Sequence, residues 1–252
     1  MARVTVDLPQ HQYQVVIEPG ALEALGEHVR AVVPHADCAL LGDEAVFAHY
    51  GDAAGASLQK AGYRVATRSA PMGEAQKTLA LAQGFYDILL DERLERRAPV
   101  IALGGGVAGD TVGFVAATYL RGVPFVQCPT TLLAMVDSSV GGKTGVNVPQ
   151  GKNLVGAFHQ PSVVVADPLV LRTLPDRELR CGFAECVKHA VIRDASLLDF
   201  IESNAAGLHG RDPDLLVELV RRNVEIKAKV VALDEREAGV RAHLNLDRKS
   251  VV

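Results

Sequence analysis

Apolar residues follow two different periods along this chain, and these periods predict its architecture. Residues 3–8 alternate apolar and polar side chains, as in a half-buried strand, whereas 100–103 and 125–128 are continuous apolar runs typical of buried strands. We expect strands at 3–8, 13–17, 38–41, 63–67, 100–103, 125–128 and 162–167, and helices at 21–29, 53–61, 76–91 and 111–119. This alternation predicts the α/β class with a parallel sheet.

After Leu174 and Pro175 the period becomes helical throughout. Helices are expected at 180–192, 195–203 and 213–231. We therefore predict an α/β domain over residues 1–175 and a helical domain over residues 176–252.

Composition narrows the functional classes. The chain has 252 residues, of which 48% are apolar and 22% charged, and its net charge of −4 argues against a general nucleic-acid binder. It contains no apolar run of the ~18–20 residues that a membrane span needs. Four cysteines without CxxC spacing, and no secretory leader, predict buried reduced thiols and a cytoplasmic protein.

The segment 100–161 carries the clearest candidate chemistry. A strand runs into Gly104-Gly105-Gly106, then into a helix and a second strand, which is a βαβ unit. Spaced glycines let backbone N–H groups approach a pyrophosphate at a helix N-terminus, so we predict an anion and nucleotide site. Asp110 has a simpler explanation as the N-cap of the following helix.

Polar residues beyond the expected strand ends extend this site, each with a simpler alternative. Asp43 suits either a ribose hydroxyl or a helix N-cap, and Glu74 with Lys77 follows a turn that Pro and Gly alone explain. Arg121 suits either the helix macrodipole or a substrate. Further candidates are Thr130, Thr131, Asp137, Lys143 and Lys152, the last two in a glycine-rich loop too long to be a plain connection.

Glu185, Lys188 and His189 share one face of the helix expected at 180–192. This pattern suits a metal ligand with a neighbouring cation, but by itself it favours a surface salt bridge. Apolar neighbours such as Phe183 and Val187 argue against a fully solvated face. Lys227, within an apolar stripe, either extends to solvent or points into a site.

Four segments in order, GGGVAGDTVGFVAATYLRG, CPTTLLAMVDSSVGGKTGVN, GKNLVGAFHQP and FAECVKHA, resemble the 3-dehydroquinate synthase family over almost the whole chain. The resemblance implies a Rossmann-like NAD-binding domain followed by a helical metal-binding domain, NAD and zinc (or cobalt) as cofactors, and a homodimer when full length. It implies conversion of 3-deoxy-D-arabino-heptulosonate 7-phosphate to 3-dehydroquinate and phosphate by oxidation, elimination, reduction and aldol closure, with no nucleic-acid or membrane partner.

The resemblance also assigns residues. It implies that NAD is held by Asp43, Glu74, Lys77, Gly106, Val107, Ala108, Gly109, Asp110, Thr130, Thr131, Lys143, Lys152 and Thr173. It implies substrate or catalytic contacts from Arg121, Asp137, Lys143, Lys152, Asn153, Lys188, Lys227, Arg241 and Asn245. It makes Glu185 the first zinc ligand, which reverses the preference for a salt bridge.

The chain departs from the family after His243-Leu244-Asn245, where a segment like GHTFGHA with a zinc-ligand histidine is expected. Arg248 stands in its place, so the chain is interpreted as C-terminally truncated, with one metal ligand and no activity of its own. Residues 247–252 are interpreted as a non-native tail, because DRKSVV is what a common sequencing-adapter sequence encodes. The apolar stripes of 180–192 and 213–231 should be left partly uncovered, which predicts poor solubility.

Three alternatives remain open. The chain could belong to another sugar-phosphate cyclase that makes an inosose or a valiolone, or to an NAD- and metal-dependent polyol dehydrogenase. It could also bind NAD weakly and catalyse nothing.

Overall fold

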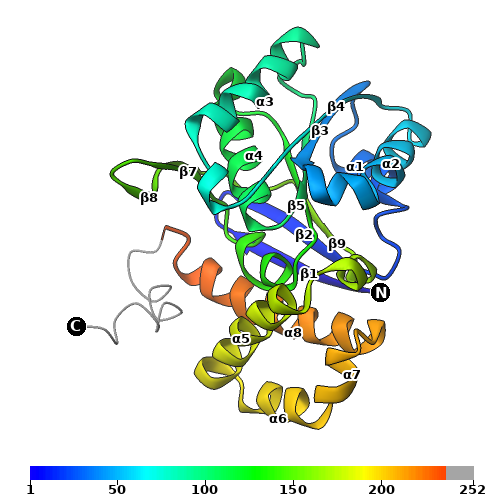
Figure 1. The fold of residues 1–252 in the computed structure, drawn as a ribbon, viewed down its shortest axis with the longest axis vertical. Helices are drawn as coiled ribbons and strands as arrows, with labels where there is room; N and C mark the ends of the chain where they lie inside the picture. The colour runs from blue at the N-terminus through cyan, green and yellow to red at the C-terminus, as the bar shows by residue number, and fades with distance from the viewer. Residues whose placement is uncertain (237–252) are drawn as a thin grey trace.

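A computed structural model describes residues 1–236 of the chain (Figure 1). The strands are β1 (Ala2–Leu8), β2 (His11–Ile17), β3 (Asp37–Asp43), β4 (Arg64–Ala70), β5 (Val100–Gly104), β6 (Phe125–Pro129), β7 (Lys143–Val148), β8 (Gly151–Phe158) and β9 (Val163–Ala166). The helices are α1 (Leu25–Val32), α2 (Glu44–Lys60), α3 (Leu79–Asp91), α4 (Gly106–Thr118), α5 (Asp176–Arg193), α6 (Ala195–Ser203), α7 (Ala205–His209) and α8 (Pro213–Leu233). Short helical turns are η1 (Glu74–Gln76), η2 (Tyr119–Arg121), η3 (Ala134–Ser138, a π-helix) and η4 (Pro168–Thr173).

Seven strands form one sheet in the order β1-β2-β9-β6-β5-β3-β4. All neighbours pair in parallel except β1 and β2. From β3 the chain first extends the sheet outward to β4 and then returns to place β5 on the other side of β3. This reversal between β3 and β5 is the place where parallel sheets bind ligands, beyond the carboxyl ends of their strands.

Apolar side chains fill both faces of the sheet. One cluster joins α3 and α4 to the sheet and includes Phe85, Val112 and Phe125. The other joins α1, α2 and the helices after residue 175 to the opposite face, and includes Leu25 and Leu216. The central strands β5, β6 and β9 are buried along their whole length, which accounts for their continuous apolar runs. The predicted α/β class with a parallel sheet is confirmed.

Helices α5 to α8 lie together at one side of the sheet in Figure 1, and α8 packs along β1. The start of α5 at Asp176 agrees with the residue chosen as a boundary, and the division into two domains stays a prediction. The expectation that the apolar stripe of 213–231 is uncovered was wrong. Leu216, Val220 and Val224 are fully buried, because β1 and α5 cover them.

Three other expectations differ from the structure. The helix expected at 53–61 is α2 and begins at Glu44, because Asp43 caps it. The glycine-rich segment expected as an irregular loop is the hairpin β7–β8, whose strands approach so closely that a Cβ on Gly156 would lie 2.2 Å from the Thr144 carbonyl oxygen. Three cysteines are buried as expected, but Cys181 is exposed.

No helix within residues 1–236 is long and apolar enough to cross a membrane.

Candidate active site

The glycine turn after β5 presents the uncapped N-terminus of α4. Gly105 is the N-cap residue, and within residues 1–236 no side chain caps the free N–H groups of the first turn. A Cβ on Gly105 would lie 3.0 Å from Thr131 Cγ2, and one on Gly106 would lie 3.1 Å from Ser138 Oγ. Glycine therefore keeps the space above these N–H groups open, as an anion site requires. The predicted role of Asp110 as N-cap was wrong, since α4 begins at Gly106.

The ends of neighbouring strands surround this turn. Asp43 ends β3, and its side chain accepts a hydrogen bond from Ala45 N at 3.0 Å, so its N-cap role is confirmed. A Cβ on Gly104 would lie 3.4 Å from Asp43 Cβ, which places both residues at the reversal between β3 and β5. Burial raises the pKa of Asp43 above its ordinary value. Its contact with a ribose stays a prediction.

The three threonines differ in their surroundings. Thr130 N donates to Gly104 O at 2.9 Å, and its buried hydroxyl has no hydrogen-bond partner among residues 1–236. Thr131 Oγ1 accepts from Ala134 N at 3.1 Å and so starts the turn that leads into η3. Thr173 lies on η4, where its hydroxyl bonds to Tyr50 Oη at 2.8 Å. Only Thr130 and Thr131 lie directly beside the glycine turn.

Lys77 links helix α4 to the β7–β8 hairpin. Its side chain is 4% exposed, and its Nζ donates to Asp110 Oδ2 at 2.6 Å and to Asn153 Oδ1 at 2.5 Å. Burial raises the pKa of Asp110 even though the ammonium group of Lys77 lowers it. Asn153 Oδ1 accepts this hydrogen bond, which leaves its Nδ2 group as the donor of the amide.

Asn147 attaches the β7–β8 hairpin to the turn before α3. Its Nδ2 donates to Glu74 Oε1 at 2.9 Å, and its Oδ1 accepts from Asn153 N at 2.9 Å. Lys152 lies 3.5 Å from Glu74 Oε1, and both side chains are largely exposed. Burial raises the pKa of Glu74, but the Asn147 hydrogen bond and the charges of Lys77 and Lys152 outweigh it, so the pKa is lowered. Asn147 was not among the site residues predicted from the sequence.

Three possible metal ligands meet between η3 and α5. Ligand atoms of Asp137, Glu185 and His189 all lie within 4.8 Å of one another. Asp137 is placed by the π-helix η3, a local widening that is frequent at functional sites. Glu185 is half-buried and His189 fully buried, which rules out the solvated salt-bridge interpretation. These three residues could hold a metal ion, and the prediction of Glu185 as the single metal ligand of the chain stays a prediction.

Two lysines accompany these ligands. Lys188 Nζ lies 2.7 Å from Glu185 Oε1, and Lys227 of α8 donates a hydrogen bond to Asp137 Oδ1. Burial opposes ionisation of Glu185, but contacts with His189 and Lys188 outweigh it and lower its pKa. Lys227 is buried and points into the site, and its charge also reaches Asp110. The charged groups therefore form one continuous region from Lys77 to Glu185.

Arg121 does not join this region within residues 1–236. It follows α4, whose 13 residues separate it from Gly106 by about 20 Å at 1.5 Å per residue. Leu120 and Arg121 have positive φ values of 47° and 66°, an uncommon conformation for side-chain-bearing residues. Lys143, at the start of β7, is exposed. The predicted substrate residues Arg121 and Lys143 stay predictions, and Arg241 and Asn245 lie outside the described residues, as do His243 and the tail 247–252.

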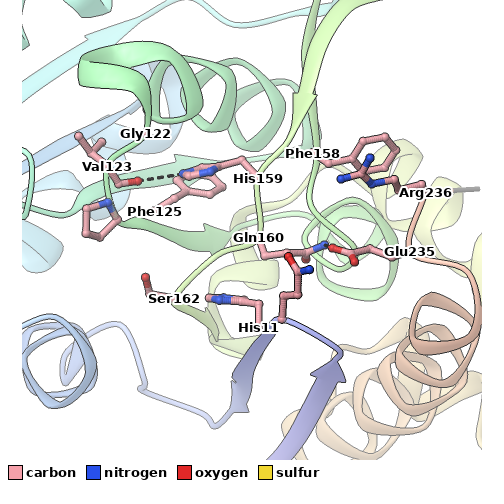
Figure 2. A pocket seen from close by; sticks show the side chains of 12 residues that line it. His11, Gly122, Val123, Phe125, Phe158, His159, Gln160, Ser162, Glu235 and Arg236 are labelled. Atoms are coloured by element: carbon pink, nitrogen blue, oxygen red, sulfur yellow. Dashed lines mark hydrogen bonds between the residues drawn. The ribbon is translucent and has the colours of Figure 1, made fainter.

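A separate pocket of about 500 Å³ lies at the amino ends of the parallel strands, away from their carboxyl ends (Figure 2). His11, Phe125 and Ser162 line it at the amino ends of β2, β6 and β9. His159 Nε2 lies 2.9 Å from Val123 O in its wall. This pocket is therefore at the other end of the strands from the glycine turn, which follows the carboxyl end of β5.

Known proteins share this architecture. The 2-epi-5-epi-valiolone synthase ValA of Streptomyces hygroscopicus subsp. jinggangensis, solved with NAD⁺ and Zn²⁺, superposes with a TM-score of 0.87 and 32% identity over 96% of this chain and 67% of its own. A 2-deoxy-scyllo-inosose synthase complexed with carbaglucose-6-phosphate, NAD⁺ and Co²⁺ has a TM-score of 0.89 at 24% identity, over 97% of this chain and 66% of its own. The fold is thus that of the sugar-phosphate cyclases.

Sequence similarity specifies the family. Residues 67–181 match the 3-dehydroquinate synthase N-terminal family, and residues 182–247 match the 3-dehydroquinate synthase C-terminal family. The 3-dehydroquinate synthase of Symbiobacterium thermophilum is 52% identical over 241 residues, which is 95% of this chain and 67% of the relative. That of Nostoc sp. is 48% identical over 244 residues, with 96% and 67% covered. The chain belongs to the 3-dehydroquinate synthase family, and it spans about two thirds of the length of these relatives.

Proposed function

We propose that this chain carries the nucleotide- and metal-binding parts of a 3-dehydroquinate synthase, a lyase that converts 3-deoxy-D-arabino-heptulosonate 7-phosphate to 3-dehydroquinate and phosphate. The observation that supports this most directly is the meeting of Asp137, Glu185 and His189 next to Lys188 and Lys227. Oxygen and imidazole ligands suit zinc or cobalt, and the lysines suit an anionic sugar phosphate.

The residues fit both cofactors. The uncapped N-terminus of α4, kept open by Gly105 and Gly106, suits a pyrophosphate, and Asp43 at the strand reversal suits a ribose hydroxyl. The buried Nε2 of His189 has no hydrogen-bond partner among the described residues and faces the acidic pair, which suits a cation. When bound, NAD supplies reversible oxidation of a carbinol, and a divalent metal polarises the hydroxyl group that is oxidised.

The protein's own groups supply position and charge. Lys188 and Lys227 place two ammonium groups beside the acidic residues, where they can hold the carboxylate or phosphate of the substrate. Lys77 pairs with Asp110 and occupies the Asn153 amide oxygen, so the Asn153 Nδ2 group is the part of that amide that could donate to a ligand. Asn147 bonds both to Glu74 and to the backbone of Asn153, and so fixes the β7–β8 hairpin against the turn before α3. Asn153 and Lys152 are thereby held near the residues that we propose to bind the nucleotide.

Sequence identity favours a 3-dehydroquinate synthase over another sugar-phosphate cyclase or a dehydrogenase. The chain is 48–52% identical to 3-dehydroquinate synthases but 32% identical to the valiolone synthase. A 1,3-propanediol oxidoreductase is 16% identical with a TM-score of 0.68, and a glycerol dehydrogenase of Schizosaccharomyces pombe is 18% identical with a TM-score of 0.64, which indicates a shared fold alone. We also propose a homodimer as the full-length form and a cytoplasmic location.

The test is a product assay on two proteins. One is the 252-residue chain, and the other is this chain extended with the C-terminal third of the Symbiobacterium thermophilum relative. We expect the extended protein to release phosphate and form 3-dehydroquinate, identified by NMR, without net NADH formation. We expect little or no turnover from the 252-residue chain. A different carbocycle, or accumulation of NADH, would contradict the proposal in favour of another cyclase or a dehydrogenase.

A further inference from the structure

The segment GKNLVGAFHQP ends in three residues that the proposed function does not use, His159, Gln160 and Pro161. They follow β8, and Gln160 lies in the wall of the pocket shown in Figure 2. Its side chain contacts two parts of the chain that are far apart in sequence. One is the glycine turn at 141–142, which precedes β7, and the other is Glu235, which follows α8.

The amide of Gln160 has a fixed orientation. Its Nε2 donates to Glu235 Oε1 at 2.9 Å, and an ionised carboxylate can only accept a hydrogen bond. The amide oxygen therefore points away from Glu235, and it is buried without a hydrogen-bond partner within residues 1–236. Turning the amide over would place this oxygen against the carboxylate, so Glu235 holds the amide in one position.

The same amide covers Gly142. A Cβ on Gly142 would lie 2.7 Å from both Cδ and Nε2 of Gln160 and 2.8 Å from its Oε1. Gly141 and Gly142 have φ values of 101° and 64°, in the region that favours glycine. The Gly141 N–H donates to Tyr13 Oη at 3.1 Å, and the Gly142 carbonyl accepts from His159 N at 2.8 Å. The turn is thus held by β2 on one side and by residues 159–160 on the other.

The turn leads directly into Lys143, the first residue of β7. Two consecutive glycines have many accessible conformations, so the direction in which Lys143 leaves the turn depends on the contacts that fix the glycine backbone. Gln160 supplies one of these contacts and is itself held by Glu235. Because Glu235 follows α8, the position of Lys143 is tied to the helix that extends Lys227 into the candidate active site.

We propose that Gln160 is a positioning residue for Lys143. Its hydrogen bond to Glu235 holds the amide against Gly142, and the amide holds the turn in the conformation that directs Lys143 to the cofactor. This inference rests on the proposed function, because it takes Lys143 as one of the residues that hold NAD.

The experiment measures the NAD⁺ affinity of the 252-residue chain by calorimetric titration. Gln160→Glu keeps the shape of the side chain but sets two carboxylates against each other, and adding Glu235→Gln restores the hydrogen bond with its roles reversed. We expect Kd to rise about tenfold in Gln160→Glu, as in Lys143→Ala, and to recover in the reversed pair. The control is Gln83→Ala, which removes an exposed hydrogen bond to Asp87 on α3 and should leave Kd unchanged.

Combination with Lys143→Ala distinguishes positioning from a general effect on folding. If Gln160 acts through Lys143, Gln160→Glu should weaken NAD⁺ binding no further once Lys143 is replaced, whereas independent effects would multiply. Glu235→Ala removes the acceptor without adding a charge and, if Gln160→Glu does not fold, takes its place: it should raise Kd in the wild type but not in Lys143→Ala.

The outcomes separate this inference from the proposed function. An unchanged Kd in Gln160→Glu, no recovery in the reversed pair, or an equal loss in the Lys143→Ala background would overturn the role of Gln160 and leave the proposed function intact. An unchanged Kd in Lys143→Ala would also overturn it, because Gln160 would have no cofactor contact to position. If the wild-type chain binds no NAD⁺, both fail.

Discussion

Gly182 of α5 lies directly against Leu132, and a methyl group on Gly182 would stand 2.5 Å from Leu132 Cβ. The same group would lie 2.8 Å from the backbone nitrogen of Leu133. These leucines lead into η3, so the missing side chain lets α5 approach the turn that carries Asp137. Glu185 lies three residues further along α5 and reaches Asp137 because of this close approach.

We therefore expect Gly182→Ala to separate the possible metal ligands. Overpacking of this kind costs roughly 1–3 kcal/mol, less the gain of up to about 1 kcal/mol from replacing glycine in a helix. The free energy of unfolding should fall, and the affinity for Zn²⁺ should fall with it, as measured by urea denaturation and calorimetric titration.

The matched control is Gly55→Ala in α2, where an added methyl group meets no atom within 4 Å. This variant should be unchanged or more stable by up to about 1 kcal/mol, with unchanged Zn²⁺ affinity. Equal Zn²⁺ affinity in both variants would show that the Gly182 contact does not position the ligands.

Lys77→Met should be destabilising. It leaves the carboxylate of Asp110, whose side chain is 22% exposed, without its ammonium partner, and the loss should approach the roughly 3–5 kcal/mol that breaking a fully buried pair costs. Lys152→Met removes a lysine from a pair whose side chains are 70% and 48% exposed, and should cost about 0–1 kcal/mol. Urea denaturation of both variants checks the contrast, and similar losses would contradict it.

The loss in Lys77→Met should also depend on pH. The pKa of Asp110 is raised by burial, so its stabilising contribution is fully present below its unfolded-state pKa and is lost as pH rises through the folded-state pKa. Without Lys77 that pKa rises further. The destabilisation should therefore be smaller at about pH 5 than at about pH 8. Asp110→Asn combined with Lys77→Met should remove this difference; a difference that persists would implicate another group.

Local pattern predicted the parts of the fold and site that depend on neighbours in sequence. The glycine turn after residue 103 and the run of polar residues beyond β6 could be predicted, because the end of a strand and the turn after it are determined largely by consecutive residues. Glu185 with Lys188 is a helical spacing, so their shared face was predictable too.

Other parts depend on contacts that no local pattern records. The hydrogen bond between His189 and Asn223 joins residues that are 34 apart in sequence and lie on two helices. The residues of the π-helix at 134–138 do not differ in composition from those of the short apolar turn that the sequence suggested there. The hairpin β7–β8 was missed because its glycines, which allow close strand approach, resemble those of a loop. The burial of α8 depends on β1, at the other end of the chain.

Cysteine reactivity should distinguish the one exposed thiol from the three buried ones. Burial raises the pKa of Cys38 to about 12 and raises the pKa of Cys128 and Cys186 as well. Because the thiolate is the reactive form, these three should not react in the folded chain. We expect a thiol reagent such as Ellman's to label Cys181 alone, Cys181→Ser to abolish labelling, and denaturant to expose the other three. Rapid labelling of more than one thiol in the native protein would contradict this.

The last prediction concerns the surface of α5. Val191 is 67% exposed and Val187 36% exposed, one turn apart on the same face, whereas the stripe of α8 is covered. Contiguous apolar surface favours association, so we expect concentration-dependent oligomers of the 252-residue chain in sedimentation velocity experiments. Replacing both valines by lysine should reduce these oligomers, because charged groups would have to lose their hydration to associate. Val32→Lys, at a residue of α1 that is 45% exposed, is the control and should leave association unchanged. If the α5 double variant associates like the wild type, this face is not the cause.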